Sequence, residues 1–193
     1  NPNRFIVLTG HYDHLGMMGQ KAMFKGANDN ASGIAMMLNM VEYYSDEKNR
    51  PKYSLAFIAF AGEEAGLLGS KHYVQNPVFP LDSIEFLINV DLMGTGEDGI
   101  TVVNGAIHEE EFNTLVDLND KNAYLKQVKK RGKAANSDHY PFSEEGVPAF
   151  FLYTMGGIAA YHDVHDKPET LPLTEFEDVF RLIRDFISTL DEQ

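Results

Sequence analysis

Two adjacent carboxylates, Glu63 and Glu64, are well placed in this sequence to carry chemistry. They follow Gly62 and an apolar run, residues 54–60, which is typical of a buried strand. In open α/β sheets, the loops at the carboxyl ends of strands usually hold the functional groups. Two neighbouring carboxylates are costly to bury together unless cations or protons neutralise them. We therefore interpret this turn as one where a carboxylate holds a metal ion while its neighbour transfers a proton.

Other predicted strand ends and loops supply further candidate residues: His11, Asp13, Asp29, Asp91 and His162. Taken singly, each has a structural explanation; Asp29, for example, is also a good helix N-cap. Taken together, they offer carboxylate oxygens and imidazole nitrogens but no sulfur, because the chain has no cysteine. This ligand set is typical of a pair of divalent ions, and the imidazoles favour zinc. The sequence therefore predicts a two-metal hydrolase site.

The composition restricts the alternatives. A chain of 193 residues with 44% hydrophobic and 23% charged residues is ordinary for one globular domain with a sizeable core. The formal net charge of -13 argues against nucleic acid or an anionic membrane surface as a partner. The absence of cysteine excludes disulfides, a thiol nucleophile and a thiolate zinc site. No run approaches the roughly 20 apolar residues of a membrane-spanning helix.

The pattern of apolar residues predicts strands that alternate with helices. Predicted strands occupy residues 5–9, 54–60, 84–90, 100–103, 124–128 and 147–153. Predicted helices occupy residues 34–44, 67–75, 109–120 and 138–145, followed by a last helix whose apolar face runs from Leu173 to Leu190. The stretch 15–28, rich in glycine and methionine, has no periodicity and is interpreted as a loop. This alternation predicts a three-layer α/β sandwich around a mostly parallel, mixed sheet.

Several other motifs are rejected. The run 94–99 satisfies the dinucleotide-binding pattern G-x-G-x-x-G, but a strand rather than a helix follows it. His108 begins a sequence like the zincin motif, yet Phe112 stands where the second histidine is needed. No G-x-S-x-G elbow is present, which disfavours a serine hydrolase. His14 and His165 are kept as second-choice metal ligands.

The candidate motifs occur in one order along the chain. They are His11-Tyr-Asp13, Gly26-Ala-Asn-Asp29-Asn-Ala-Ser-Gly33, Gly62-Glu63-Glu64, Asn89-Val-Asp91, Ser137-Asp-His139 and Tyr161-His162. This combination resembles metallopeptidase family 28, the co-catalytic di-zinc aminopeptidases of the aminopeptidase Y and leucyl aminopeptidase type. The likeness runs from residue 4 to about residue 173 and implies a zinc-exopeptidase-like fold.

The resemblance implies a set of five metal ligands: His11, Asp29, Glu64, Asp91 and His162. Asp29 would bridge two divalent ions, most simply zinc. His11 and Asp91 would complete the protein shell of one ion, and Glu64 and His162 that of the other. The family also has a cis peptide after the bridging aspartate.

Other roles follow from the same resemblance. Glu63 would be the general base that accepts a proton from the attacking water. Tyr161 would help to hold the tetrahedral oxyanion. Asp13 would orient His11, and Asp138 would lie next to the ligands without binding a metal ion itself. The resemblance places the cis peptide between Asp29 and Asn30.

The expected activity is removal of the N-terminal residue from a peptide with a free N-terminus. A glutaminyl-cyclase-like, single-zinc acyltransferase is an alternative, although such relatives have tryptophan before the last histidine and this chain has Tyr161 and no tryptophan. A carboxypeptidase variant and a non-catalytic binding domain of the same fold are further alternatives. A binding domain would have lost ligands or the base, which are present here.

The chain begins with Asn1-Pro2-Asn3, a turn signature, and a predicted strand follows at once. We therefore expect residues 1–193 to form a single di-zinc peptidase domain truncated at its N-terminus, with a preceding strand and any targeting segment missing. A secreted or periplasmic location is expected from the habit of the family.

Overall fold

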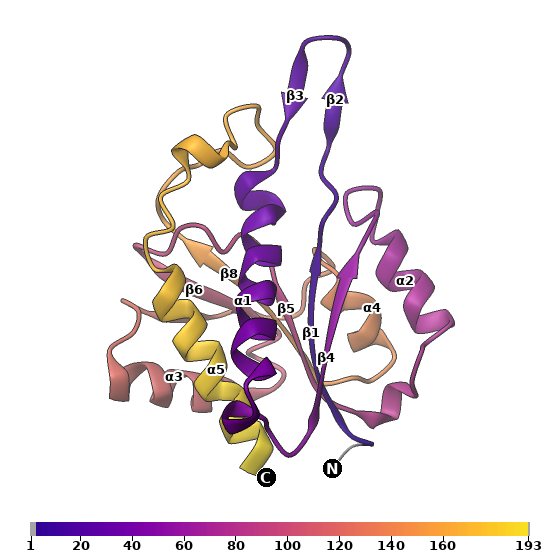
Figure 1. Cartoon of the computed structure of the whole chain (residues 1–193), viewed down its shortest axis with the longest axis vertical. Coiled ribbons are helices and arrows are strands. Elements are labelled where there is room, and N and C mark those ends of the chain that lie inside the picture. The colour runs from indigo at the N-terminus through magenta and orange to yellow at the C-terminus, as the bar shows by residue number, and fades with distance from the viewer. Residues whose placement is uncertain (1–2, 193) are drawn as a thin grey trace.

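A six-stranded sheet forms the centre of the structure, a computed structural model that describes residues 3–192 (Figure 1). Its strands are β1 (Phe5–His11), β4 (Ser54–Phe60), β5 (Ile84–Val90), β6 (Gly99–Val103), β7 (Val128–Lys130) and β8 (Ala149–Met155). They lie in the order β4-β1-β5-β8-β6-β7. All neighbouring pairs are parallel except β6 and β8, which are antiparallel. The predicted mostly parallel, mixed sheet is confirmed.

Helices cover both faces of this sheet, as predicted. The α-helices are α1 (Gly33–Ser45), α2 (Leu68–Gln75), α3 (Glu109–Asn122), α4 (His139–Glu144) and α5 (Phe176–Glu192). Short 3-10 turns lie at Glu47–Asn49, Leu81–Ser83 and Pro168–Thr170. Helices α1, α3 and α5 pack on one face of the sheet, and α2 and α4 pack on the other (Figure 1). No helix within residues 3–192 is long and apolar enough to cross a membrane.

The two-sided covering explains why β1 is a continuous apolar run. Ile6 and Leu8 belong to the core beneath α1 and α5, whereas Val7 lies between them in sequence and belongs to the core beneath α2 and α4. All three side chains are fully buried. Because successive side chains of a strand point to opposite faces, a strand buried on both faces needs apolar residues at every position.

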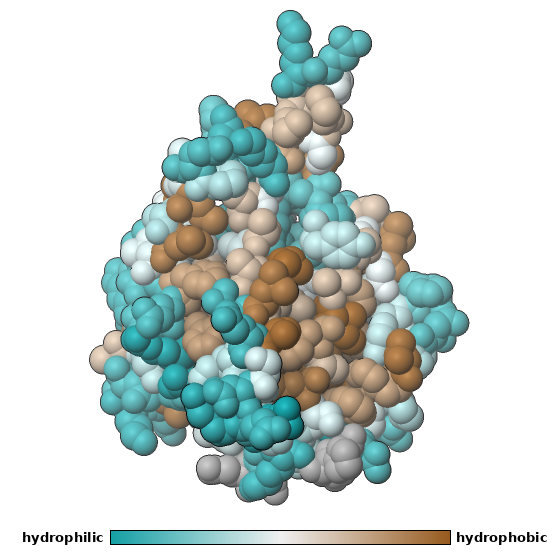
Figure 2. All heavy atoms as spheres, viewed as in Figure 1, coloured by the Kyte–Doolittle hydropathy of each residue, from teal (hydrophilic) through white to brown (hydrophobic). Residues whose placement is uncertain are grey.

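The predicted loop at residues 15–28 is wrong in part, because it contains a hairpin. Strands β2 (Gly16–Met18) and β3 (Ala22–Phe24) pair antiparallel and project from the rest of the molecule (Figure 1). Met17, Met18 and Met23 are exposed on this hairpin, and Figure 2 shows an apolar stem beneath a hydrophilic tip. A hairpin that packs on no core has no buried face, so its sequence carries no alternating pattern.

The short edge strand lies further along the chain than predicted, at β7 instead of residues 124–128. The side-chain amide of Asn119 donates to the carbonyl oxygen of Leu125 at 3.0 Å, and its oxygen accepts from the Leu125 amide at 2.9 Å. These bonds hold the chain against the end of α3, so pairing with β6 begins at Val128. Two lysines then form the outer strand, where positive charge discourages pairing with other chains.

The last helix begins at Phe176, later than its predicted apolar face. Leu173 precedes the helix with a left-handed φ of 52°, and its amide donates to the carbonyl oxygen of Gly94 at 2.9 Å. Its side chain is 48% exposed. From Val179 to Leu190 the predicted helical face is buried as expected, except for Phe180, which is partly buried against the core.

The sheet topology brings three functional segments together. His11 is the last residue of β1 and pairs with Phe60, the last residue of β4. On its other side β1 pairs with β5, with Thr9 opposite Asn89. The carboxyl ends of β4, β1 and β5 are therefore neighbours, and the residues that follow them converge at one edge of the sheet.

Candidate metal centre

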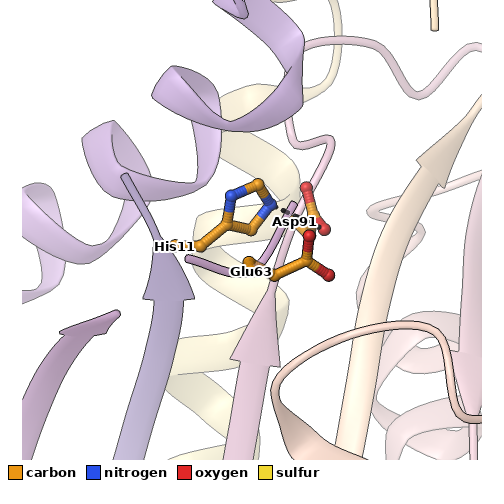
Figure 3. Close-up of side chains that lie close together, drawn as sticks. All are labelled: His11, Glu63 and Asp91. Carbon is orange, nitrogen blue, oxygen red and sulfur yellow. Dashed lines mark hydrogen bonds and ion pairs between the residues drawn. The ribbon is translucent and has the colours of Figure 1, made fainter. Parts of the chain in front are cut away.

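His11 and Asp91 form the buried centre of this edge (Figure 3). They are 1% and 6% exposed. Nε2 of His11 lies 3.3 Å from Oδ2 of Asp91 and 3.4 Å from Oδ1 of Asp29. Nδ1 of His11 lies 3.0 Å from the carbonyl oxygen of Asp13, which can only accept a hydrogen bond. Nδ1 must therefore carry a proton, and Nε2 is the nitrogen that can bind a cation.

A second group lies on the other side of Asp29. Nε2 of His162 is 3.2 Å from Oδ2 of Asp29 and 3.1 Å from Oε2 of Glu64. The two oxygens of Asp29 thus face different imidazoles, Oδ1 toward His11 and Oδ2 toward His162. Each imidazole also has a second carboxylate of its own. The five residues expected to bind metal are all brought together in this arrangement.

His14 joins this second group, although sequence reasoning gave it second rank. Its Nδ1 lies 2.8 Å from Oε1 of Glu64 and 3.8 Å from Oδ2 of Asp29. His14 comes three residues after His11, beyond the end of β1. Its position in the loop after a strand that ends in a candidate ligand was the available sequence signal. His165, the other second-choice residue, is exposed and its side chain has no contact with this cluster among those found in residues 3–192.

Asp29 is held in place through its backbone. The amides of Asn28 and Asp29 donate to the carboxylate of Asp166 at 2.8 and 3.0 Å. The peptide between Asp29 and Asn30 is cis, as the family resemblance predicted. Asp166 was not among the predicted site residues, because a carboxylate that binds backbone amides has no characteristic partner residue in the sequence.

The alternative role considered for Asp29, a helix cap, is carried out by its neighbour. Oδ1 of Asn30 accepts from the amide of Gly33 at 2.9 Å, at the start of α1, and Nδ2 of Asn30 donates to the carbonyl oxygen of Val90 at 3.1 Å. A Cβ at Gly33 would lie 2.2 Å from Oδ1 of Asn30. Glycine is therefore required here, and the carboxylate of Asp29 remains free for the cluster.

Asp13 contacts the Glu63-Glu64 turn as well as His11. Its carboxylate accepts from the amides of Glu63 and Glu64 at 3.2 and 3.3 Å. Its Oδ1 lies 3.8 Å from Nδ1 of His11, further than its own carbonyl oxygen. Asp13 thus positions His11 through its backbone and the two glutamates through its side chain.

Burial and negative charge perturb the groups around Glu63. Burial raises the pKa of Glu63 to about 8, with added repulsion from Asp91 and partial relief from His11. Burial also raises the pKa of Asp138 to about 6, although the hydroxyl of Ser70 donates to its carboxylate at 2.6 Å. Without bound cations, these two carboxyl groups therefore exchange protons near neutral pH, the range in which general acids and bases work.

His11 responds to the same negative charge. Burial opposes its protonation, but the carboxylates of Asp29 and Asp91 outweigh that effect and raise its pKa to about 12. The metal-free cluster therefore holds a proton that a cation can replace. Such an excess of buried carboxylate is balanced by positive charge in folded proteins.

The donor atoms of this cluster fit a pair of divalent cations. Oδ1 of Asp91 is buried and has no hydrogen-bond partner within the described residues, and the buried Oδ2 of Asp29 and Oε1 of Glu64 have only imidazole nitrogens close to them. The candidate ligand atoms form two groups, His11, Glu63 and Asp91 in one and His14, Asp29 and Glu64 in the other, and within each group the atoms lie within 4.8 Å of one another. Buried, unpartnered carboxylate oxygens beside imidazoles are the ligand set of zinc.

A cavity of about 310 Å³ opens beside the carboxylates. It is lined by Asp29, Glu63, Asp91, Leu92, Asn136, Phe151, Tyr153 and Tyr161. Tyr161, one of these lining residues, stacks on His162 with ring centroids 3.9 Å apart. One side of this cavity is acidic and the other is aromatic and apolar, which suits an organic cation with an apolar side chain.

The chain belongs to peptidase family M28, whose sequence profile it matches over residues 1–187. This confirms the family that the order of the motifs indicated. Among solved structures, a zinc aminopeptidase from Bacillus subtilis is similar with a TM-score of 0.79 and 25% identity, over 97% of this chain and 46% of that protein. The predicted zinc-exopeptidase-like fold is confirmed by this likeness.

Two curated relatives represent different activities. A probable zinc metalloprotease from Pyrenophora teres f. teres is 36% identical over 103 residues, which are 51% of this chain and 21% of that protein. A glutaminyl-peptide cyclotransferase from Drosophila melanogaster is 24% identical over 220 residues, covering 96% of this chain and 62% of that protein. This chain therefore spans less than two thirds of the length of each of these proteins.

Proposed function

We propose that this chain is the metal-binding domain of a zinc aminopeptidase, which removes the N-terminal residue from peptides. The observation that carries the proposal is the position of Asp29, whose two oxygens lie 3.4 and 3.2 Å from the imidazoles of His11 and His162. The site has two halves: Asp91 lies beside His11 in one, and Glu64 lies beside His162 in the other. A carboxylate shared between two such halves is suited to bridging a pair of ions.

Two zinc ions in these positions would acidify a water molecule between them and polarise the scissile carbonyl group. Glu63 contributes the proton transfer. It lies with His11 and Asp91 at the same edge of the sheet (Figure 3). Because the proposed ligand set leaves its carboxylate free, Glu63 can accept a proton from the attacking water and return it to the leaving amine.

Tyr161 contributes a hydrogen bond at the reacting carbonyl. Partial burial, together with the charges of Asp29 and Glu64, raises the pKa of Tyr161 to about 12. The phenol therefore stays protonated over the working pH range and can donate to an oxyanion. Its stacking on His162 fixes the direction of the ring. A donor already in place when the negative charge develops stabilises the transition state.

The residues that line the cavity favour an aminopeptidase over other kinds of peptidase. The acidic side of the cavity attracts a protonated α-amine, and Leu92 and Phe151 on its walls favour an apolar first side chain. A peptide with a blocked N-terminus lacks that charge and should bind poorly. The proposed substrates are therefore peptides with a free N-terminus and an apolar first residue.

Release of p-nitroaniline from leucine p-nitroanilide tests this function, with N-acetyl-leucine p-nitroanilide as the matched control. The proposal expects turnover of the free amine only, loss of activity on chelation, and recovery on adding zinc. Equal turnover of the acetylated compound would contradict an aminopeptidase.

The cyclotransferase relative makes glutaminyl cyclisation the second candidate. It is tested by incubating the same preparation with a peptide that begins with glutamine. Formation of a pyroglutamyl peptide without release of a free amino acid would favour the cyclase. The shared position of Asp29 between two imidazoles favours two ions and therefore hydrolysis.

A further inference from the structure

We propose that His14 is an additional ligand of the metal ion held by Asp29, Glu64 and His162. The proposal rests on the two-metal function above and adds a third imidazole to its ligand set. Nδ1 of His14 approaches Oε1 of Glu64 at 2.8 Å, while Nε2 of His162 approaches Oε2 at 3.1 Å. The two imidazoles therefore lie on either side of one carboxylate, with ring centroids 5.9 Å apart.

The surroundings of His14 leave its nitrogens nothing else to bind. The side chain is 7% exposed. Apart from its approaches to Glu64 and Asp29, neither ring nitrogen has a hydrogen-bond partner within residues 3–192. Burying a polar group without a partner costs free energy, so an imidazole is stable here only if a cation or a carboxylate engages it. Oδ2 of Asp29 and Oε1 of Glu64 are unpartnered in the same way and complete the group.

The backbone leaves room for this ring. Gly26 has a left-handed φ of 66°, and a Cβ at this position would lie 2.6 Å from Cγ of His14 and 2.4 Å from the carbonyl oxygen of Asp29. Any other residue would therefore collide with both the imidazole and the bridging residue. A glycine in this conformation allows the ring of His14 and the Asp29 backbone to approach each other.

A third imidazole would make the two halves of the site unequal. The half containing His11 has one imidazole, whereas the half containing Glu64 would have two. The side chain of His162 is 37% exposed, whereas the side chain of His14, on the loop that directly follows β1, is 7% exposed. More nitrogen ligands favour zinc over manganese or magnesium, which prefer oxygen. The half with two imidazoles should bind zinc more tightly and fill first.

The competing explanation is that His14 only donates a hydrogen bond to Glu64 and orients it. The substitution His14→Asn separates the two roles, because an asparagine amide can still donate to the carboxylate but is a poor zinc ligand. His165→Asn is the matched control, since it removes an exposed histidine three residues beyond His162.

Zinc-edge X-ray absorption of the zinc-loaded wild-type chain counts the imidazoles directly and needs no variant. The proposal expects three imidazoles for two zinc ions, two in His14→Asn and three in His165→Asn. Calorimetric titration of metal-stripped protein with zinc should show one dissociation constant raised by about 100-fold in His14→Asn. The same constant should not change in His165→Asn.

Two zinc ions with only two imidazoles in the wild type would overturn the role of His14 and leave the two-metal function intact. Unchanged zinc affinity of folded His14→Asn would overturn it as well. A single bound zinc ion with His14 among its ligands would instead contradict the two-metal function while supporting the ligand. Circular dichroism of the metal-free variant checks that it folds.

Discussion

Adjacent carboxylates on one turn have different surroundings in this molecule. Glu64 lies between the imidazoles of His14 and His162, whereas Glu63 lies near His11 and Asp91 and lines the cavity. The carboxylate of Asp13 accepts hydrogen bonds from the backbone amides of both glutamates. The turn can therefore supply a metal ligand and a proton acceptor from consecutive residues.

Replacing Glu63 by Gln tests this division of roles. The amide keeps the shape of the side chain but cannot accept the proton of water, so kcat should fall by about 1,000-fold. Zinc content should remain as in the wild type. Glu145→Gln, at an exposed glutamate of the same chain, is the control and should change neither quantity. Loss of zinc from Glu63→Gln would show that Glu63 is a ligand.

Tyr161→Phe tests the hydrogen bond proposed for the oxyanion. Phenylalanine preserves the stacked ring on His162 but removes the donor. We expect kcat to fall by about 100-fold with little change in KM, because the bond is made only as charge develops on the carbonyl oxygen. Steady-state kinetics on leucine p-nitroanilide measure both constants. An unchanged kcat would exclude this role.

At the scale of elements, α4 and β8 bury a histidine beneath the cavity. His139 is fully buried and its ring lies 5.3 Å from that of Phe151, which lines the cavity. Burial lowers the pKa of His139 to about 4 from its ordinary value of 6.5. The folded protein thus keeps this imidazole neutral, while the unfolded chain binds a proton below pH 6.5.

The sign of the resulting pH dependence follows from this difference. Above pH 6.5 the titration of His139 does not change the unfolding free energy. As the pH falls from 6.5 toward 4, the unfolding free energy decreases progressively, because the unfolded chain binds a proton that the folded chain does not. His139→Phe keeps a ring against Phe151 and removes the titrating group. Between pH 7 and pH 4, the metal-free variant should gain about 3 kcal/mol in unfolding free energy relative to wild type. Urea unfolding of both proteins at each pH measures this difference in unfolding free energy. A difference that does not change with pH would contradict the lowered pKa of His139.

Strands rich in apolar residues were predictable, and strands whose side chains are mostly exposed were not. The bounds of β4 and β5 agree with the prediction, because apolar residues fill most positions of both strands. The β2–β3 hairpin was missed because its methionines are exposed and show no period. The position of β7 depends on the hydrogen bonds of Asn119 to Leu125, which no local pattern reveals.

Site residues at strand ends were predictable for the same reason. His11 ends β1 and Asp91 directly follows β5, and these strands are parallel neighbours, so the proximity of the two residues follows from the sheet. Asp166 was not predictable, because it binds amides rather than side chains. His14 was ranked low because the paths of loops, unlike strands, are not fixed by periodicity.

At the scale of the molecule, the net charge of -13 and the buried carboxylates make cations part of stability. Zinc that binds only the folded chain stabilises it by mass action. At free zinc of 100 times the dissociation constant, each site should add about 2.7 kcal/mol to the unfolding free energy. Thermal unfolding with zinc or with a chelator measures this effect. Equal unfolding temperatures in both would contradict a metal-dependent fold.

The number of zinc ions bound per chain tests the central claim most directly. Calorimetric titration of the metal-stripped chain should give two ions, and Asp29→Ala should lose tight binding at both sites because its carboxylate faces both imidazoles. Binding of a single ion, or an Asp29→Ala variant that keeps one tight site, would contradict a shared carboxylate and favour a single-zinc enzyme.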